Sequence, residues 1–395
     1  MVMNAVNYLY HIIMGRVLGP VDYGTLSSLY SILYLVGIVP TSTSVAIVKF
    51  ISSVKNDTEV YSIYKALERF ILRLSLALSL LLLITTPLTA NFLQIKDVWS
   101  VASVSLILFL ILILLLNQAT SQGLLKFMGS VGPGLISSVV KLGLGLLLVI
   151  LGWSVLGAMV GVIFGMFFAY LYSYFFLKKN MQETKIKPFH LGPFFKFALP
   201  SLLQALAFTS FFTVDVILAK HFLSPFEAGI YGALSTLGKI IFFAVSPIIS
   251  TMFPIISGRA SRQEEYGNIL GLSLLAVVFL GGTVVFLYYL FPELAIGILY
   301  GKAYLVATSE LFLMGLFVLF YSLSYFWVNF FLSVGDTKII WVPLAVALVQ
   351  IPALWKFHQN IREVVTVNLW LGVLLFLVII GYVGYNSLKI KYGKR

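Results

Sequence analysis

Long apolar runs recur along the whole chain, and they constrain its fold more than any other feature. A transmembrane helix needs about 20 mostly apolar residues, and about twelve such runs can be marked in this sequence. The chain has 395 residues, of which 60% are hydrophobic and 10% charged, and its mean hydropathy is +1.03. The surface of a soluble domain needs roughly 25% charged residues. The sequence therefore predicts an all-α polytopic membrane protein.

A short polar turn between apolar runs occurs twice. Its copies are Leu18–Gly24 and Leu223–Gly229, which share Leu, Pro and Gly and keep an acid at the fifth place, Asp22 and Glu227. Proline fixes φ and glycine permits positive φ, so each copy is expected to end one helix and start the next. The two acids are expected to be turn and capping groups.

A second repeated set of residues supports an internal duplication of the chain. Four residues recur at an offset of 212: Asn117, Ser121, Gly123 and Lys126 match Asn329, Ser333, Gly335 and Lys338. The sequence therefore predicts an N-terminal six-helix lobe (1–177), a cytoplasmic linker (178–196), a C-terminal six-helix lobe (197–388) and a basic cytoplasmic tail (389–395). Six spans return the chain to its starting side, so a pseudo-twofold axis along the membrane normal is expected.

The sixth predicted span, about Val155 to Leu177, carries glycines at four-residue spacing. Gly157, Gly161 and Gly165 lie on one face of a helix at this spacing. Small residues in such a row let a neighbouring helix approach closely. The row is therefore expected to pack against another helix.

The basic balance of the chain, +12 at neutral pH, fits a membrane protein without a nucleic-acid partner. Lysine and arginine normally concentrate in cytoplasmic loops, and most of the 26 here fall on one side if the N-terminus is cytoplasmic. We therefore expect a multi-pass protein of the cell membrane with both termini in the cytoplasm. There is no cysteine, which excludes disulfides and thiolate metal sites.

Enzyme and cofactor motifs are missing. The nearest look-alike of an ATP-binding loop, Gly297 to Lys302, has the wrong spacing and is followed by Ala303. The four histidines are scattered, and no H-E-x-x-H pair is present. We therefore expect neither an enzyme nor a bound cofactor or metal. Any transport would be driven by a coupled ion, H⁺ or Na⁺, or by the downhill path of the substrate.

Lysines within the predicted spans are the first candidates for function. A charge at the bilayer centre costs about 2.5–3.5 kcal/mol, so such residues usually face a cavity. Lys141 and Lys239 lie nearest the centres of their spans, while Lys49 and Arg73 lie closer to the cytoplasmic side. Snorkelling to the interface is an equal alternative for Lys49 and Arg73. A wet cavity lined by Lys and Arg would attract anions, above all phosphate.

Two acids within the spans are candidates for ion coupling. Asp215 and Glu310 lie in the outer halves of the seventh and tenth predicted spans. Such groups could exchange H⁺ or Na⁺ as a cavity changes its exposure. Asp215 could equally be a structural partner for Lys220 or Lys239.

Two motifs resemble a known family. Arg16, Leu18, Gly19, Pro20, Tyr23 and Gly24 resemble the R-x-L-G-P-x-x-Y-G signature of polysaccharide and O-antigen flippases, within the multidrug/oligosaccharidyl-lipid/polysaccharide exporter superfamily. The stretch around Asp215, with Ser224-Pro225 and Gly229-Ile230-Tyr231, is similar to the segment between the seventh and eighth spans of that family. The short first span departs from the family pattern.

The resemblance implies a V-shaped, two-lobed transporter of the MATE type. It would move undecaprenyl- or dolichyl-type lipid-linked oligosaccharides outward by alternating access, with the lipid tail left in the bilayer. The other expected partners are membrane lipids and glycan-assembly enzymes, and the protein is expected to be a monomer.

The expected roles can be assigned by position. Lys141 and Lys239 would hold the substrate phosphate, Lys49 and Arg73 would recruit it, and Arg16 would lie at the outer mouth of the cavity. Asp215 and Glu310 would couple the ion. Two alternatives stay open: a cation-coupled multidrug exporter of the same superfamily, and a non-transporting membrane scaffold for glycan assembly.

Overall fold

The computed structural model describes residues 2–54, 56–182, 184–186, 188 and 192–392. Within these ranges the chain is helical and contains no β-strand, as the sequence predicts. The chain divides into two compact units, Met1–Thr209 and Ser210–Arg395. Parts of the predicted linker (183, 187 and 189–191) and the last three residues of the predicted tail lie outside the described residues.

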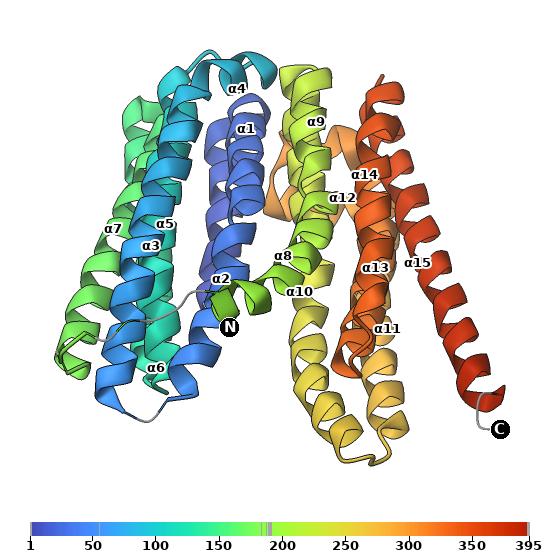
Figure 1. The fold of residues 1–395 in the computed structure, drawn as a ribbon. Helices are drawn as coiled ribbons and strands as arrows, with labels where there is room; N and C mark the ends of the chain where they lie inside the picture. The colour runs from blue at the N-terminus through green and yellow to red at the C-terminus, as the bar shows by residue number, and fades with distance from the viewer. Residues whose placement is uncertain (1, 55, 183, 187, 189–191, 393–395) are drawn as a thin grey trace. The chain divides into compact units, whose positions relative to one another are not determined.

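The first unit is built from eight helices and one short π-helical turn (Figure 1). In chain order they are α1 (Val2–Val36), α2 (Ile38–Ser52), α3 (Asp57–Ile84), α4 (Thr86–Phe92), α5 (Val98–Gly123), α6 (Phe127–Leu148), η1 (Val149–Trp153), α7 (Ser154–Asn180) and α8 (Gly192–Phe211). The last two residues of α8 already belong to the second unit.

The second unit continues with seven helices in the described residues and two 3₁₀ turns. In chain order they are α9 (Val214–Phe222), α10 (Pro225–Ser261), α11 (Gly267–Leu290), α12 (Pro292–Leu299), η2 (Lys302–Ala307), α13 (Thr308–Ser333), η3 (Thr337–Ile340), α14 (Trp341–Lys356) and α15 (Ile361–Tyr392).

Eight helices in the described residues are long and apolar enough to cross a membrane, or nine if the bent pair α3 and α4 is one span. The chain is therefore a multi-pass membrane protein. The predicted number of twelve spans and the twofold axis stay predictions. The number eight takes 127–180 as a single span, although this stretch turns back on itself between α6 and α7.

The order of elements repeats between the units. In each, a long helix is followed by a short helix with proline at its first or second position, α4 after α3 and α12 after α11. A 26-residue helix comes next, α5 or α13. Figure 1 shows α4 lying across the end of α3, and the two axes differ by 53°.

The turns that end α5 and α13 correspond at an offset of 210 residues, whereas the residues repeated in the sequence are 212 positions apart. Leu125 and Gly335 adopt positive φ, 58° and 89°. The amide of the residue after each, Lys126 or Asp336, donates to a carbonyl five residues back. The repeated residue types are therefore shifted by two positions relative to the repeated turn geometry.

Both copies of the repeated turn break a helix, as predicted. Gly19 inside α1 has φ 72° and ψ 175°, so the helix stops there and starts again at Pro20. In the second copy α9 ends at Phe222 and α10 begins at Pro225, with Ser224 and Glu227 forming a capping box. The capping role predicted for Glu227 is confirmed.

Asp22 has a different role. It accepts a hydrogen bond from the hydroxyl of Ser154, at the start of α7. Ser154 and Gly152 both have positive φ in the tight turn between α6 and α7. The acid of the first copy therefore ties α1 to the turn between α6 and α7.

The glycine row of α7 packs against α6, as predicted (Figure 1). A Cβ at Gly161 would lie 2.5 Å from the Cα of Gly145, and one at Gly165 would lie 2.7 Å from the carbonyl oxygen of Ser137. The pairs run in opposite chain directions, so α6 and α7 form an antiparallel hairpin in backbone contact. This contact fixes the position of Lys141, which lies on α6 between the two crossings.

Candidate functional site

A cavity of about 480 Å³ lies within the first unit. Side chains of α1, α5, α6, α7 and α8 and of the α1–α2 junction surround it, and ligand sites commonly have volumes of about 300–1,000 Å³. The polar side chains that line it include Asn7, His11, Tyr30, Tyr34, Gln118, Ser137, Ser138 and Lys141. None of the described residues that line it is Asp or Glu.

Lys141 is the charged group of this cavity and is 7% exposed. Its Nζ donates to Oδ1 of Asn7 at 2.7 Å, which joins α6 to α1. The same nitrogen lies 4.4 Å from the ring centroid of Tyr10 and 5.6 Å from that of Tyr30. An amide oxygen and two ring faces thus stabilise the ammonium without neutralising its charge.

Further polar contacts hold these groups in place. The Ser138 hydroxyl donates to the Gly134 carbonyl at 2.7 Å and lies 3.3 Å from Asn7 Oδ1. The Tyr10 hydroxyl donates to the carbonyl of Ala158 on α7. The ring of His11 packs edge-on against Tyr30, with centroids 4.6 Å apart. The lysine therefore lies in a pre-arranged polar and aromatic surrounding.

A second polar centre lies in the other unit, around Asp215. Its Oδ2 accepts from the Tyr231 hydroxyl at 2.6 Å, and Tyr231 accepts from the Asn368 amide at 3.0 Å. Asn368 Oδ1 in turn accepts from Gln350 Nε2 at 2.7 Å. All four side chains are buried and come from α9, α10, α14 and α15. Asp215 Oδ1 is buried without a side-chain hydrogen-bond partner in the described residues.

Asp215 lies next to a break in its span. Helix α8 ends at Phe211 and α9 begins at Val214, so Asp215 is in the first turn of α9. The carbonyl of Phe211 at the break accepts from Gln350 Nε2 at 3.0 Å. A helix N-terminus is a positive dipole end, and irregular backbone within a span is stable only where protein or water satisfies it.

Lys239 faces the same region from α10. Its Nζ lies 4.9 Å from the ring centroid of Phe212, and it is within electrostatic reach of Asp215. The Phe212 ring stacks on Tyr321 at 4.7 Å. Lys239 and Asp215 therefore share one centre, which favours the predicted alternative of Asp215 as a partner for Lys239 over a pairing with Lys220.

Comparison with known proteins places the chain in a family. The profile of the family described as polysaccharide biosynthesis protein matches residues 1–260. The chain belongs to this polysaccharide biosynthesis family. The predicted resemblance to polysaccharide flippases is thereby confirmed at the level of the family. A search of curated proteins found no significant sequence match.

Solved structures show the fold of this family member. A multidrug resistance MATE family transporter of the MOP superfamily, in an inward-facing conformation, aligns with a TM-score of 0.77 and 14% identity over 97% of this chain and 95% of that chain. The lipid II flippase MurJ, in an inward closed conformation, aligns with a TM-score of 0.77 and 15% identity over 97% and 86%. The predicted MATE-like, all-helical fold is therefore confirmed.

The other predicted site residues of the first unit do not line its cavity. The side chains of Arg16, Lys49 and Arg73 are exposed and none lines the cavity. Arg73 shares the exposed face of α3 with Leu72 and Leu76. Snorkelling along the lipid-facing surface, the alternative weighed for Arg73, fits this position.

Glu310 lies in the first turn of α13 and is half-buried. Its Oε2 accepts from the hydroxyl of Ser309 at 2.7 Å. An acid in the first turn of a helix is stabilised by the helix dipole, which explains its position without a ligand.

Neutral polar residues complete both centres, and reasoning from charge missed them. The set comprises Asn7, Tyr30, Gln350 and Asn368, together with His11, which was counted only as scattered. One signal was available in the sequence: Asn7 and His11 are four residues apart and therefore lie on one helix face, in an otherwise apolar run.

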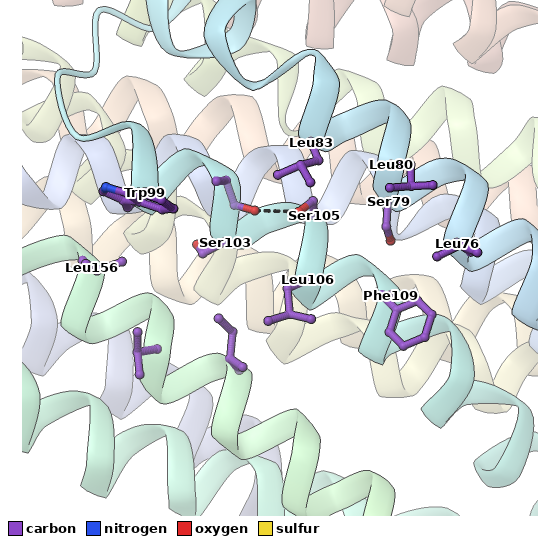
Figure 2. Close-up of a pocket in the computed structure, with 13 residues that line it drawn as sticks. Leu76, Ser79, Leu80, Leu83, Trp99, Ser103, Ser105, Leu106, Phe109 and Leu156 are labelled. Carbon is purple, nitrogen blue, oxygen red and sulfur yellow. Dashed lines mark hydrogen bonds between the residues drawn. The ribbon is translucent and has the colours of Figure 1, made fainter.

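An apolar groove of about 600 Å³ lies elsewhere in the first unit, between α3, α5 and α7. Figure 2 shows Trp99 toward one end of this groove and Leu76 and Phe109 toward the other. Ser105 donates to the carbonyl of Ala102 in its own helix, so its hydroxyl is satisfied. The groove offers hydrocarbon surface and no charged side chain among the residues that line it.

Proposed function

We propose that this protein is a transporter that flips lipid-linked oligosaccharides of the polyprenyl-pyrophosphate type across the cell membrane by alternating access. Membership of the polysaccharide biosynthesis family supports a substrate that carries a glycan, and the fold shared with MurJ and MATE transporters supports a transport function. In this proposal both termini lie in the cytoplasm, the protein acts as a monomer, and it receives its substrate from glycan-assembly enzymes.

The observation that carries the proposal is Lys141 in a cavity without a carboxylate among the described residues that line it. An ammonium held by an amide oxygen and ring faces has no opposite charge among these contacts to neutralise it, so its charge can act on a ligand. In a low-dielectric surrounding such a charge attracts phosphate strongly. The substrate pyrophosphate would bind Lys141, with the lipid chain beyond its first units in the bilayer.

The polar centre of the second unit would couple an ion to this movement. Asp215 at a helix break, with one oxygen lacking a side-chain partner, offers a place for H⁺ or Na⁺. Lys239 would bind phosphate in one state and contact Asp215 in the other. Lys49 and Arg73 would recruit the anionic substrate, Arg16 would act at the outer mouth, and Glu310 is the second candidate for coupling.

A multidrug exporter is the competing function, and MATE transporters are among the structures with this fold. An organic cation would meet the ammonium of Lys141 in the cavity of the first unit, and like charges repel strongly in a low dielectric. The cavity therefore favours an anionic substrate. A non-transporting scaffold for glycan assembly would give the buried Lys141 no role.

The test is flipping of a fluorescent lipid-linked oligosaccharide in proteoliposomes. The double variant Lys141→Ala/Lys239→Ala is expected to abolish flipping while the protein stays folded. The matched control is Lys302→Ala/Lys338→Ala, which removes two exposed lysines and is expected to flip normally. Normal flipping by the first variant, or efflux of organic cations by the wild type with no flipping, would overturn the proposal.

A further inference from the structure

Helix α3, which forms a membrane span together with α4, carries two arginines on its exposed side. Arg69 and Arg73 are four residues apart, so they lie on the same face of the helix. Neither has a hydrogen-bond or ion-pair partner among the described residues. Lys65, one turn earlier, differs because Glu68 neutralises it at 2.7 Å. A charged side chain within a span is costly, and it usually pairs with an opposite charge.

Arg73 lies far from both ends of α3. Along the helix axis it is about 24 Å from Asp57 and about 17 Å from Ile84, at 1.5 Å per residue. The phosphates of membrane lipids lie outside a hydrocarbon core about 30 Å thick. The α-carbon of Arg73 is therefore at a depth where the bilayer itself supplies no anion.

The apolar groove between α3, α5 and α7 begins one turn beyond Arg73. Its lining residues on α3 continue the side of the helix that carries the arginines, at i, i+4 and i+7 spacing: Leu76, Leu80 and Leu83. Figure 2 shows Leu76, the lining residue nearest to Arg73 in the chain, toward the end of the groove opposite Trp99. These three leucines, Arg69 and Arg73 are called the α3 face below.

Small side chains leave the space of about 600 Å³ in this groove. On α5 they are Ala102, Ser103 and Ser105, and they lie between the leucines of α3 and the aliphatic side chains of α7. In a membrane, small residues of this kind allow another helix to approach closely. The groove and the two arginines therefore offer a shape and a charge to one occupant.

We propose that the α3 face binds a transmembrane helix of another protein that carries Asp or Glu near its middle. The carboxylate would pair with Arg73, and apolar side chains on the same side of the partner helix would fill the groove. Arginine can bind a carboxylate through two parallel hydrogen bonds, and such a pair is strong in a low dielectric. The inference goes beyond the proposed function, because it concerns a partner chain and holds for any transported substrate.

A second copy of this chain does not offer the carboxylate. Among the described residues, Asp215 is buried and Glu68 pairs with Lys65. The other described acids lie at helix ends, in turns or next to the kink of α1. Lipid tails can fill the groove, but they bring no anion to the depth of Arg73. Charge and shape together therefore favour a helix from a different protein.

The test is association of the purified full chain with designed transmembrane peptides in phosphatidylcholine vesicles, measured by energy transfer between attached dyes. The peptides share an alanine- and leucine-rich sequence with lysines at both ends, and they differ only at the central residue, which is Asp or Asn. The wild type is expected to bind the Asp peptide about tenfold more tightly than the Asn peptide, because only Asp brings an opposite charge.

Two arginine variants locate the charge. Arg73→Gln is expected to bind the two peptides about equally. Arg362→Gln is the matched control, because Arg362 is exposed and lies outside the α3 face. It is expected to keep the tenfold preference for the Asp peptide.

Two phenylalanine variants locate the groove. Ala102→Phe places a large ring in the groove and is expected to weaken the binding of both peptides. Val139→Phe on the exposed side of α6 is the matched control and is expected to bind both peptides like the wild type. Leu80→Ala, which removes part of the α3 wall, replaces Ala102→Phe if that variant does not fold.

The outcomes separate a partner helix from lipid. Equal binding of the two peptides by the wild type would overturn the inference, as would a preference that persists in Arg73→Gln. Loss of the preference when phosphatidylglycerol is added to the vesicles would mean that the α3 face binds anionic lipid instead.

Recruitment of substrate by Arg73, as proposed above, is the competing role and is tested by flipping in peptide-free proteoliposomes. Reduced flipping by Arg73→Gln with an intact preference for the Asp peptide would support recruitment and overturn the inference. A preference that depends on Arg73, together with no flipping by the wild type, would overturn the proposed function and leave the inference standing.

Discussion

Lys141 Nζ lies 2.7 Å from Oδ1 of Asn7, and this hydrogen bond joins two residues 134 positions apart in the chain. The bond crosses from α6 to α1 inside the cavity of the first unit. A neutral acceptor of this kind stabilises the ammonium while leaving its charge to attract a ligand. The chemical nature of residue 7 should therefore decide whether the cavity binds anions.

Replacing Asn7 by Asp is expected to weaken pyrophosphate binding about tenfold or more. The new carboxylate would lie at hydrogen-bond distance from Lys141 and neutralise it in a low-dielectric site. Asn7→Ala removes the acceptor without adding charge, so it is expected to keep most of the binding. Calorimetric titration of the detergent-solubilised protein measures both. Equal affinities of Asn7→Asp and the wild type would show that Lys141 does not bind the anion.

The close crossing of α6 and α7 predicts a second outcome. A Cβ at Gly161 would lie 2.5 Å from the backbone of Gly145, which cannot move without separating the helices. Gly161→Ala is therefore expected to lower the free energy of unfolding by about 1–3 kcal/mol. Thermal unfolding monitored by circular dichroism measures it.

Gly143→Ala is the matched control, because it lies on α6 and a Cβ there would meet nothing within 4 Å. It is expected to be neutral or to stabilise by up to about 1 kcal/mol, since alanine favours the helix. Equal stability of the two variants would mean that the helices do not touch at Gly161.

The charged residues of the two polar centres stand out in the sequence more than the neutral ones. Lys141 and Asp215 stand out in the sequence because a charge in an apolar run is costly, and both are buried in polar centres. Asn7 and Asn368 do not stand out in a search for charges, because an amide is neutral. Their roles depend on which helices pack together, and that packing joins residues far apart in the chain.

Rotation of a helix about its axis is a second limit. Arg73 is in an apolar span like Lys141, yet it lies on the exposed face of α3 beside Leu72. The run from Tyr64 to Phe92 is apolar on several faces, so the sequence does not say which face meets lipid. The glycine row of α7 was easier, because small residues at four-residue spacing indicate the packed face directly.

The break between α8 and α9 predicts a third outcome. Gln350 Nε2 donates to both the Phe211 carbonyl and Asn368 Oδ1. Gln350→Leu leaves two buried acceptors without this donor, so it is expected to lower the free energy of unfolding by about 1–3 kcal/mol. Gln359→Leu at an exposed position is the control and is expected to change little. Unchanged thermal unfolding of Gln350→Leu would show that the break does not need this amide.

Asp215 allows ion coupling to be separated from folding. In Asp215→Asn the side-chain oxygen can still accept from Tyr231, so the protein is expected to stay folded, with a lower free energy of unfolding because Lys239 loses the opposite charge within its reach. The charge is lost, so transport should no longer respond to a gradient of Na⁺ or H⁺, while downhill flipping persists. Initial flipping rates in proteoliposomes with and without each imposed gradient measure this.

Glu310→Gln is the matched variant, because Glu310 is the other predicted coupling acid and is half-buried at a helix start. It is expected to keep the full gradient response. A response retained in Asp215→Asn and lost in Glu310→Gln would move the coupling site from α9 to α13.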